Sequence, residues 1–148
     1  MRQIIYAMRF EGRAAPASPD GKILRAATSA PSSTVSSVVG ADGLTGTIEA
    51  APGGMAAFES EVTFTGEASF LESGTIAFGN GHRLRFSTVG QGYVCPGPDC
   101  GLTQGTAMWR VESGEGQFEG ATGLITSNAV LGEDLAVIDH QFGVLFLP

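Results

Sequence analysis

TIAFGNGHRLRF, residues 75–86, is the stretch that decides the fold class. Its centre, Asn80-Gly81, allows positive φ at both central positions of a type I′ turn, which joins two antiparallel strands. After the turn, apolar and polar side chains alternate along residues 82–86, so that one face of that strand is apolar and the other charged. The stretch therefore predicts a β-hairpin with one buried face.

The same signals recur along the chain, and no helical pattern of twelve or more residues accompanies them. Near-alternation in FESEVTF, residues 58–64, predicts another half-buried strand, and Asp42-Gly43 and residues 132–134 predict turns. Residues 14–20 and 30–33 contain proline and predict loops. The predicted strands are residues 2–11, 22–28, 34–39, 44–50, 56–65, 68–78, 82–94, 103–112, 124–131 and 135–147, with the second and third the weakest.

A chain of 148 residues suits one domain, residues 1–148, with one core. Long antiparallel strands in series leave unpaired edges, and closing the sheet removes them. We therefore predict a single closed antiparallel β-barrel of about eight strands, with a two-sheet sandwich as the alternative. A barrel of this size has an interior that side chains fill or that holds one small ligand.

Composition excludes several classes of partner. The net charge is −7, and Lys22 is the only lysine, so the clustered cations that phosphate backbones and anionic lipids require are lacking. No stretch approaches the ~20 apolar residues of a membrane span, and residues 1–11 predict a first strand rather than a signal peptide. We therefore expect no nucleic acid and no membrane partner, and a cytoplasmic location.

No motif for a bound cofactor is recognisable. The sequence has no P-loop, no H-E-x-x-H and no G-x-S-x-G, and Gly90-Gln91-Gly92 lacks the helix that follows a dinucleotide site, so it predicts a bulge. Cys95 and Cys100 flank PGPD, and they are either a disulfide or, more often in a cytosolic protein, plain loop cysteines. His82 and His140 lack zinc-finger spacing. We expect no metal and no cofactor.

One segment goes beyond pattern. Residues 114–123, GEGQFEGATG, resemble the G-x-G-x-F-x-G-A-x-G element of the allene oxide cyclase and dirigent-like barrels. In physical terms the glycines let the chain bend sharply while Phe118 plugs one end of the barrel. Residues 105–111 and 124–128 look like the strands that enter and leave this element, and the resemblance covers roughly residues 56–148.

The resemblance implies a calycin-like eight-stranded barrel that is often oligomeric and carries a ligand cavity along its axis. Known members close rings or steer radical coupling without a cofactor of their own, mainly by shaping the substrate. The matched motif is structural, so no catalytic residue is carried over from the family, and the fold alone does not fix the function.

Charged side chains on the polar strand faces have two readings. In the first, the exterior of the sheet is exposed and carries cross-strand ion pairs formed by Glu59, Glu61, Arg83, Arg85 and Arg110. In the second, some face a polar lumen, where Arg85 would hold a carboxylate or enolate and Glu61 would move a proton. The face that lines the lumen decides between them.

Asp139 and His140 are adjacent on the last predicted strand, so they point to opposite faces and cannot form a dyad. His140 shares a face with Ile138, Phe142, Val144 and Phe146, and is either a core or interface residue or the general base of the site. Asp139 shares the other face with Val137, Gln141 and Leu145, which predicts a polar part of a pocket wall.

Three aromatic residues are candidates for the wall of a substrate site. Trp109, Tyr93 and Phe86 are either core packing or a stacking surface beside the ligand. Since Phe118 is expected to close one end, the mouth should lie at the other end. The rigid loop from Cys95 to Cys100 is then either a lid over that mouth or an ordinary hairpin loop.

The last strand is apolar on both faces from Val137 to Leu147, which predicts that another subunit covers the outer face in a homodimer or homotrimer. The favoured function is a cofactor-independent cyclase or isomerase that holds an apolar, polyene- or polyketide-like molecule in the barrel. The alternatives are a binding protein for such a molecule and a structural oligomer with a filled barrel.

Overall fold

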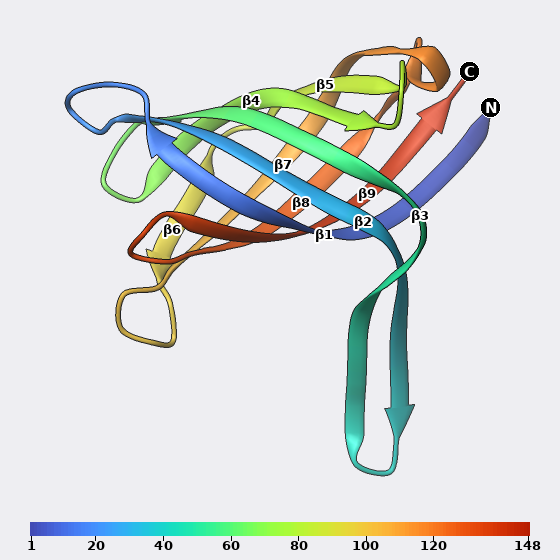
Figure 1. Cartoon of the computed structure of the whole chain (residues 1–148), viewed down its shortest axis with the longest axis horizontal. Helices are drawn as coiled ribbons and strands as arrows, with labels where there is room; N and C mark the ends of the chain where they lie inside the picture. The colour runs from blue at the N-terminus through green and yellow to red at the C-terminus, as the bar shows by residue number, and fades with distance from the viewer.

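The computed structural model describes residues 1–148 and consists almost entirely of β-strands (Figure 1). The helical part is limited to the 3₁₀ turn η1, Gly116–Phe118, and no helix is long and apolar enough to cross a membrane. The strands are β1 (Arg2–Pro16), β2 (Ile23–Gly40), β3 (Gly43–Phe64), β4 (Ser69–Phe78), β5 (Arg83–Thr88), β6 (Gly92–Pro96), β7 (Thr103–Glu115), β8 (Thr122–Leu131) and β9 (Ala136–Leu147).

All nine strands belong to one antiparallel sheet. Their order is β3-β2-β1-β9-β8-β7-β5-β4-β6, and additional pairings join β3 to β4 and β6 to β7. Because β3 and β4 pair over nine residue positions, from Ala56 with Phe78 to Phe64 with Phe70, the pairings run round in a ring. The predicted all-β class and antiparallel pairing are confirmed.

The predicted hairpin at residues 75–86 is present, but its turn is not type I′. Phe78 N–H donates to the carbonyl of His82 at 2.8 Å, and Ala77 pairs with Arg83, so three residues form the loop. Gly79 and Gly81 have φ of 91° and 75°, whereas Asn80 does not enter the positive-φ region. The extra glycine before Asn80 supplies the left-handed conformation and lengthens the loop by one residue.

Several predicted boundaries are wrong, and each error has a local cause. The predicted strand 82–94 is interrupted at Gly90, whose φ is 68°, so β5 and β6 follow one another between β4 and β7. Residues 14–16 continue β1, because Pro16 stands at the last ladder position, where its missing N–H costs little. Residues 30–33 lie within β2, where a register shift between Pro31 and Ser33 absorbs the proline.

β2 and β3 are therefore much longer than expected, and together they project from the ring as a two-stranded arm, residues 33–50 (Figure 1). Both strands bend at the same level. Pro31 breaks the ladder of β2, and Gly53 of β3 has a φ of 147°, which a side chain would strain. Ser32 Oγ donates to the carbonyl of Gly54 at 2.8 Å and ties the two bends together.

The core fills the middle of the ring with aromatic rings. Trp109 and Phe86 stack with ring centres 4.3 Å apart, and Phe58 stacks on both, at 5.5 Å from Trp109 and 5.4 Å from Phe86. Phe10 packs against Phe58 at 5.9 Å. These side chains come from four strands and share the inner face with Ile76, Leu84, Ile125 and Leu145, all fully buried.

Phe118 lies at one end of this core, against the last residue of β4. Its side chain is 2% exposed and its ring lies 5.3 Å from that of Phe78, which in turn packs edge-on to Tyr6. Gly116 and Gly120 flank it with φ of 64° and 73°, a conformation that side chains rarely adopt. Backbone geometry therefore favours glycine at Gly116 and Gly120.

Replacing Gly120 with alanine is expected to lower the free energy of unfolding by about 1–2 kcal/mol, because an L-residue in the left-handed region is strained by that amount. Urea unfolding followed by circular dichroism measures it. Gly132→Ala is the control, since Gly132 has no positive φ. An equal loss in both variants would contradict the strain argument.

The outer face of β9 is apolar, as its sequence indicates. Phe142 is 49% exposed, and Ile5 on β1 and Leu124 on β8, which flank Val144, are 59% and 47% exposed. The predicted second subunit over this face remains a prediction.

Candidate functional site

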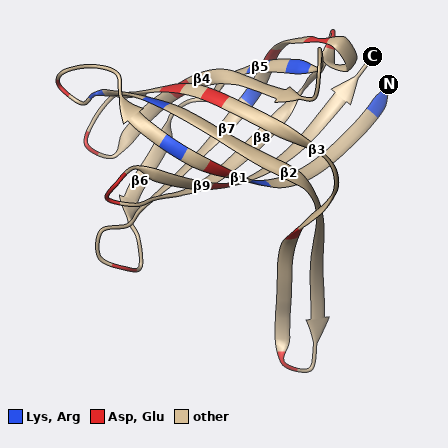
Figure 2. Cartoon of the chain, viewed as in Figure 1, with Lys and Arg blue, Asp and Glu red and all other residues tan.

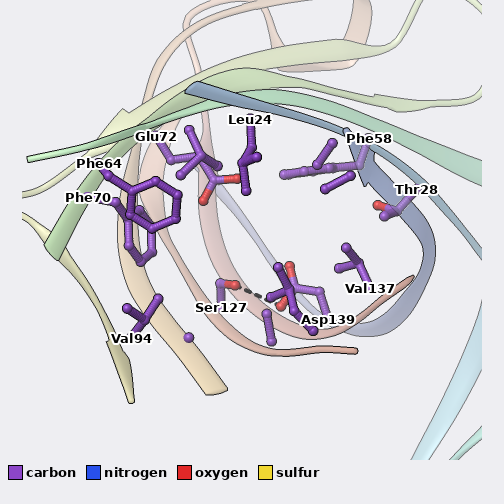
Figure 3. A pocket seen from close by; sticks show the side chains of 16 residues that line it. Leu24, Thr28, Phe58, Phe64, Phe70, Glu72, Val94, Ser127, Val137 and Asp139 are labelled. Carbon is purple, nitrogen blue, oxygen red and sulfur yellow. Dashed lines mark hydrogen bonds between the residues drawn. The ribbon is translucent and has the colours of Figure 1, made fainter. Parts of the chain in front are cut away.

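Figure 3 shows a cavity of the ring, with a volume of about 80 Å³. It lies at the end opposite Phe118. Phe118 packs on Phe78, the last residue of β4, whereas the cavity is lined by Phe70 and Glu72 near the start of the same strand. Its lining side chains come from the inner faces of β1, β2, β3, β4, β6, β7, β8 and β9, and most are apolar. They are Ala14, Leu24, Ala26, Thr28, Phe58, Val62, Phe64, Phe70, Glu72, Val94, Gly105, Ser127, Ala129, Leu131, Val137 and Asp139.

Glu72 places a carboxyl group in this apolar wall. It shares the inner face of β4 with Phe70 and Ile76, and Ser60 of the neighbouring β3 donates a hydrogen bond to its Oε2 at 2.6 Å. Burial removes water from the carboxylate and raises the Glu72 pKa from its ordinary 4.5 to about 7. The Ser60 hydrogen bond opposes this rise and the negative charge of Asp139 adds to it.

Asp139 is the second carboxyl group of the cavity. It is 5% exposed, and two donors hold it: Ser127 Oγ to Oδ1 at 2.7 Å and Gln141 Nε2 to Oδ2 at 2.9 Å. Burial raises its pKa, and the Ser127 and Gln141 hydrogen bonds oppose the rise because they stabilise the charged form. These partners come from β8 and β9, so the ladder itself fixes the carboxylate.

The two carboxyl groups enter the cavity from different walls, Glu72 from β4 and Asp139 from β9 (Figure 3). The charge of Asp139 raises the pKa of Glu72, so the two groups interact electrostatically. Since desolvation in the apolar cavity raises the pKa of both groups, ionising both at once is unfavourable. The cavity therefore holds two electrostatically coupled carboxyl groups, and the negative charge of Asp139 favours the protonated form of Glu72.

Four polar atoms in the interior lack a hydrogen-bond partner: Tyr6 Oη, Thr28 Oγ1, Trp109 Nε1 and Gln141 Oε1. The Trp109 indole N–H lies near enough to lower the Glu72 pKa, yet it does not meet hydrogen-bond geometry. Buried polar groups are normally paired with protein, water or ligand. Thr28 lines the cavity itself, so a ligand or water there would find a free hydroxyl group.

This arrangement is suited to moving protons on an apolar molecule. A carboxyl group with a pKa near the working pH gives and accepts protons at similar cost. Apolar walls exclude water, which strengthens each electrostatic contact with a reacting group. The structure brings no three His, Cys, Asp or Glu side chains together in a group that would hold a metal ion.

The structure brings three of the predicted site residues to the interior. Asp139 lines the cavity, as its position beside Val137, Gln141 and Leu145 suggests. Trp109 and Phe86 lie in the aromatic core beneath it, stacked on Phe58, which forms part of the cavity wall.

His140 and Tyr93 lie on the outer surface and do not reach the cavity. The outer face of β9 carries His140, because Asp139 takes the inner one, and Tyr93 is 59% exposed on β6. The two side chains instead share a shallow exterior groove of about 380 Å³ with Cys95, Gln104 and Asn128. As a general base for a reaction in the cavity, His140 is therefore misplaced.

Arg85 and Glu61 are also exterior residues, because both strands turn their apolar side chains inward. Glu61 pairs with Arg25 across β2 and β3 at 3.5 Å, and Arg83 pairs with Glu115 across β5 and β7 at 3.7 Å. The exterior reading of these five charges therefore describes the structure, since all of them are exposed. Charged residues are spread along the strands and loops of the chain (Figure 2).

Cys95 and Cys100 are both free and exposed, which agrees with the second alternative, cysteines without a disulfide. Their loop follows β6, whose Val94 lines the cavity, so it lies at the cavity end of the ring.

Sequence reasoning missed Glu72, whose pKa burial in the cavity raises to about 7. Its signal was present: on β4, Glu72 falls in phase with Phe70, Ile76 and Phe78, so it is a carboxylate on an apolar face. Ser60 gave the same signal between Phe58 and Val62 on β3.

Comparison with protein-family models, with curated proteins and with solved structures finds no match for this chain.

Proposed function

We propose that the ring is a closed, calycin-like barrel of the allene oxide cyclase and dirigent-like kind, with one plugged end and one ligand end. Two features support this. β5 and β6 share one position between β4 and β7, which leaves eight positions around the ring. Phe118, within the motif that carries the resemblance, closes the end opposite the cavity.

Within that barrel, the proposed activity is a cofactor-independent isomerase or cyclase reaction on an apolar small molecule. The observation that carries the proposal is Glu72: a carboxyl group in an apolar cavity with a pKa of about 7. Pairs of buried carboxyl groups with different environments are a recurrent device for acid–base catalysis at neutral pH.

The environments suggest a role for each group. Glu72, with one side-chain donor, carries the proton, and Asp139, with two donors that stabilise its charged form, carries the negative charge. Protonated Glu72 donates to a carbonyl oxygen or a double bond of the substrate and becomes a carboxylate. Asp139 accepts a proton from a neighbouring substrate carbon, and return of the proton to Glu72 through solvent closes the cycle.

The cavity also indicates the kind of substrate. Eleven of its sixteen lining residues are hydrophobic, which suits a polyene- or polyketide-like molecule with one polar group at its reacting end. A volume of about 80 Å³ accommodates only that end, so the rest of the molecule would lie in the mouth.

Deuterium exchange tests the proposal. Freshly expressed protein is examined by native mass spectrometry for a co-purifying molecule, which is then incubated with the protein in D₂O, beside a panel of β,γ-unsaturated ketones. We expect the wild type to incorporate deuterium at carbon, and Glu72→Gln and Asp139→Asn to slow this by about 10²–10⁴-fold. Unchanged exchange in both variants would contradict an acid–base role.

A binding protein without chemistry is the second candidate, favoured by the apolar lining and the unpaired Thr28 hydroxyl group. In that case a molecule co-purifies and Glu72→Gln retains it, but the wild type exchanges no carbon-bound protons. Filling the cavity by Ala129→Phe should abolish binding under either candidate, whereas Ala27→Phe, at an exposed position of β2, should not.

A further inference from the structure

The arm, residues 33–50, is a two-stranded hairpin that leaves the ring without any covering element (Figure 1). Its two faces differ. One carries Val35, Val39, Leu44 and Ile48, of which Val39 and Leu44 near the tip are 83% and 73% exposed. The other carries mostly serine and threonine, with Val38 as its apolar member. An isolated hairpin of this kind is marginally stable in water, and its open edges invite another strand.

Where the arm leaves the ring, part of one edge of β1 has no neighbouring strand. β1 pairs with β2 only from Glu11 to Pro16, whereas it pairs with β9 from Arg2 to Arg13. Continuing the β1–β2 register would set Ala7 opposite Ser33, but β2 bends away at Pro31. Residues 2–10 of β1 therefore have one edge without a strand.

This edge borders a notch of about 630 Å³ between β1 and the base of the arm, which we call the β1 notch. The Ala7 carbonyl faces it and accepts a hydrogen bond from Ser33 Oγ at 2.7 Å, so odd-numbered residues of β1 direct their backbone groups into it. Apolar side chains line most of it, namely Ile5, Tyr6, Met8, Val35, Met55 and Phe78.

Length and charge of the arm suit this notch. Eight residues of a strand span roughly 26 Å, close to the length of the open edge of β1. The arm contains Asp42 and Glu49 and no lysine or arginine, whereas β1 carries Arg2 and Arg9 before its first acidic residue, Glu11 (Figure 2). Arg2 forms no ion pair within the chain, and Arg9 pairs only with Glu11, at 2.7 Å.

We propose that the arm of one chain adds as a strand to the β1 notch of a second copy, and that the exchange is reciprocal in a two-fold symmetric dimer. The arm of a chain cannot fill the β1 notch of the same chain, because the bends at Pro31 and Gly53 direct the arm away from the ring. Backbone hydrogen bonds to the open edge supply the pairing, and the apolar arm face covers the exposed side chains of Ile5 and Met55. In such a symmetric exchange, each arm pairs with the notch of the other chain, so that neither arm and neither notch remains exposed.

Sedimentation velocity at micromolar concentrations tests the proposal. We expect a wild-type dimer, and a rise in its dissociation constant of about 100-fold or more for V39D/L44D, which charges the apolar arm face. The matched control is V38D/T45D, which adds two carboxylates on the neighbouring rung of the opposite face and should remain dimeric.

A substitution in the β1 notch provides a second, independent test. Ala7→Pro removes one N–H from the open edge without touching the β1–β9 ladder, since even-numbered residues of β1 face β9, as the bond from Ala14 N–H to the Leu135 carbonyl shows. This variant should keep the wild-type circular dichroism spectrum and become monomeric.

Three results would overturn the proposal. One is a wild type that stays monomeric at all concentrations. Another is a dimer that survives both V39D/L44D and Ala7→Pro. The third is a dimer lost only in Phe142→Asp, because the outer face of β9 rather than the arm would then hold the subunits together.

Discussion

Replacing Glu72 with glutamine is expected to raise the free energy of unfolding at about pH 8 by about 3 kcal/mol and to leave it nearly unchanged at about pH 4. The folded-state pKa of about 7 lies above the ordinary 4.5, so the folded chain holds this proton more tightly than the unfolded chain does. Protonation of Glu72 stabilises the folded state fully below pH 4.5, and this stabilisation is lost as the pH rises to about 7. Glutamine keeps an acceptor for Ser60 and carries no charge at any pH.

Urea unfolding at both pH values measures this difference, with Glu59→Gln as the control. Glu59 lies on the same strand as Ser60 but on the outer, exposed face, so this variant should keep the pH dependence of the wild type. If the unfolding free energy of Glu72→Gln depended on pH in the same way as that of the wild type, Glu72 would ionise normally. That result would contradict its proposed role as the acid.

Replacing Trp109 with alanine is expected to lower the free energy of unfolding by about 3–5 kcal/mol. The indole is fully buried and stacks on both Phe86 and Phe58, so its removal leaves a void beneath the cavity that these rings cannot fill by a change of rotamer. The loss combines the burial of the indole with the cost of the void.

Circular dichroism during urea unfolding measures this loss, because the variant has no tryptophan left for fluorescence. Met108→Ala is the matched control: it changes the preceding residue on the outer face, where Met108 is 38% exposed, and should cost about 0.5 kcal/mol or less. A Trp109→Ala loss below about 1 kcal/mol would contradict the central place of the aromatic stack in the core.

The sequence predicted the class of fold because the period of two survives in nearly every strand. Leu84 and Phe86 turn inward and Arg83 and Arg85 outward, as their alternation indicates. What the pattern could not show was where long strands continue. Proline and glycine at residues 31 and 52–54 signal breaks, yet in β2 and β3 they bend continuous strands and create the arm.

The candidate site was only partly predictable, for a physical reason. On β9 both faces are apolar, so periodicity could not tell whether Asp139 or His140 faces the interior. On β4 the apolar phase was clear, and a glutamate within it marks a buried carboxyl group. Only the sheet register, which sets β4 and β9 on different walls of one cavity, shows that Glu72 and Asp139 belong together.

The acid–base account depends first on the protonation of Glu72. A titration of the side-chain carboxyl carbons by ¹³C nuclear magnetic resonance, with the Glu72 signal assigned by its loss in Glu72→Gln, measures that protonation directly. The account predicts an inflection for Glu72 at a pKa of about 7. An inflection at the ordinary 4.5 would contradict it.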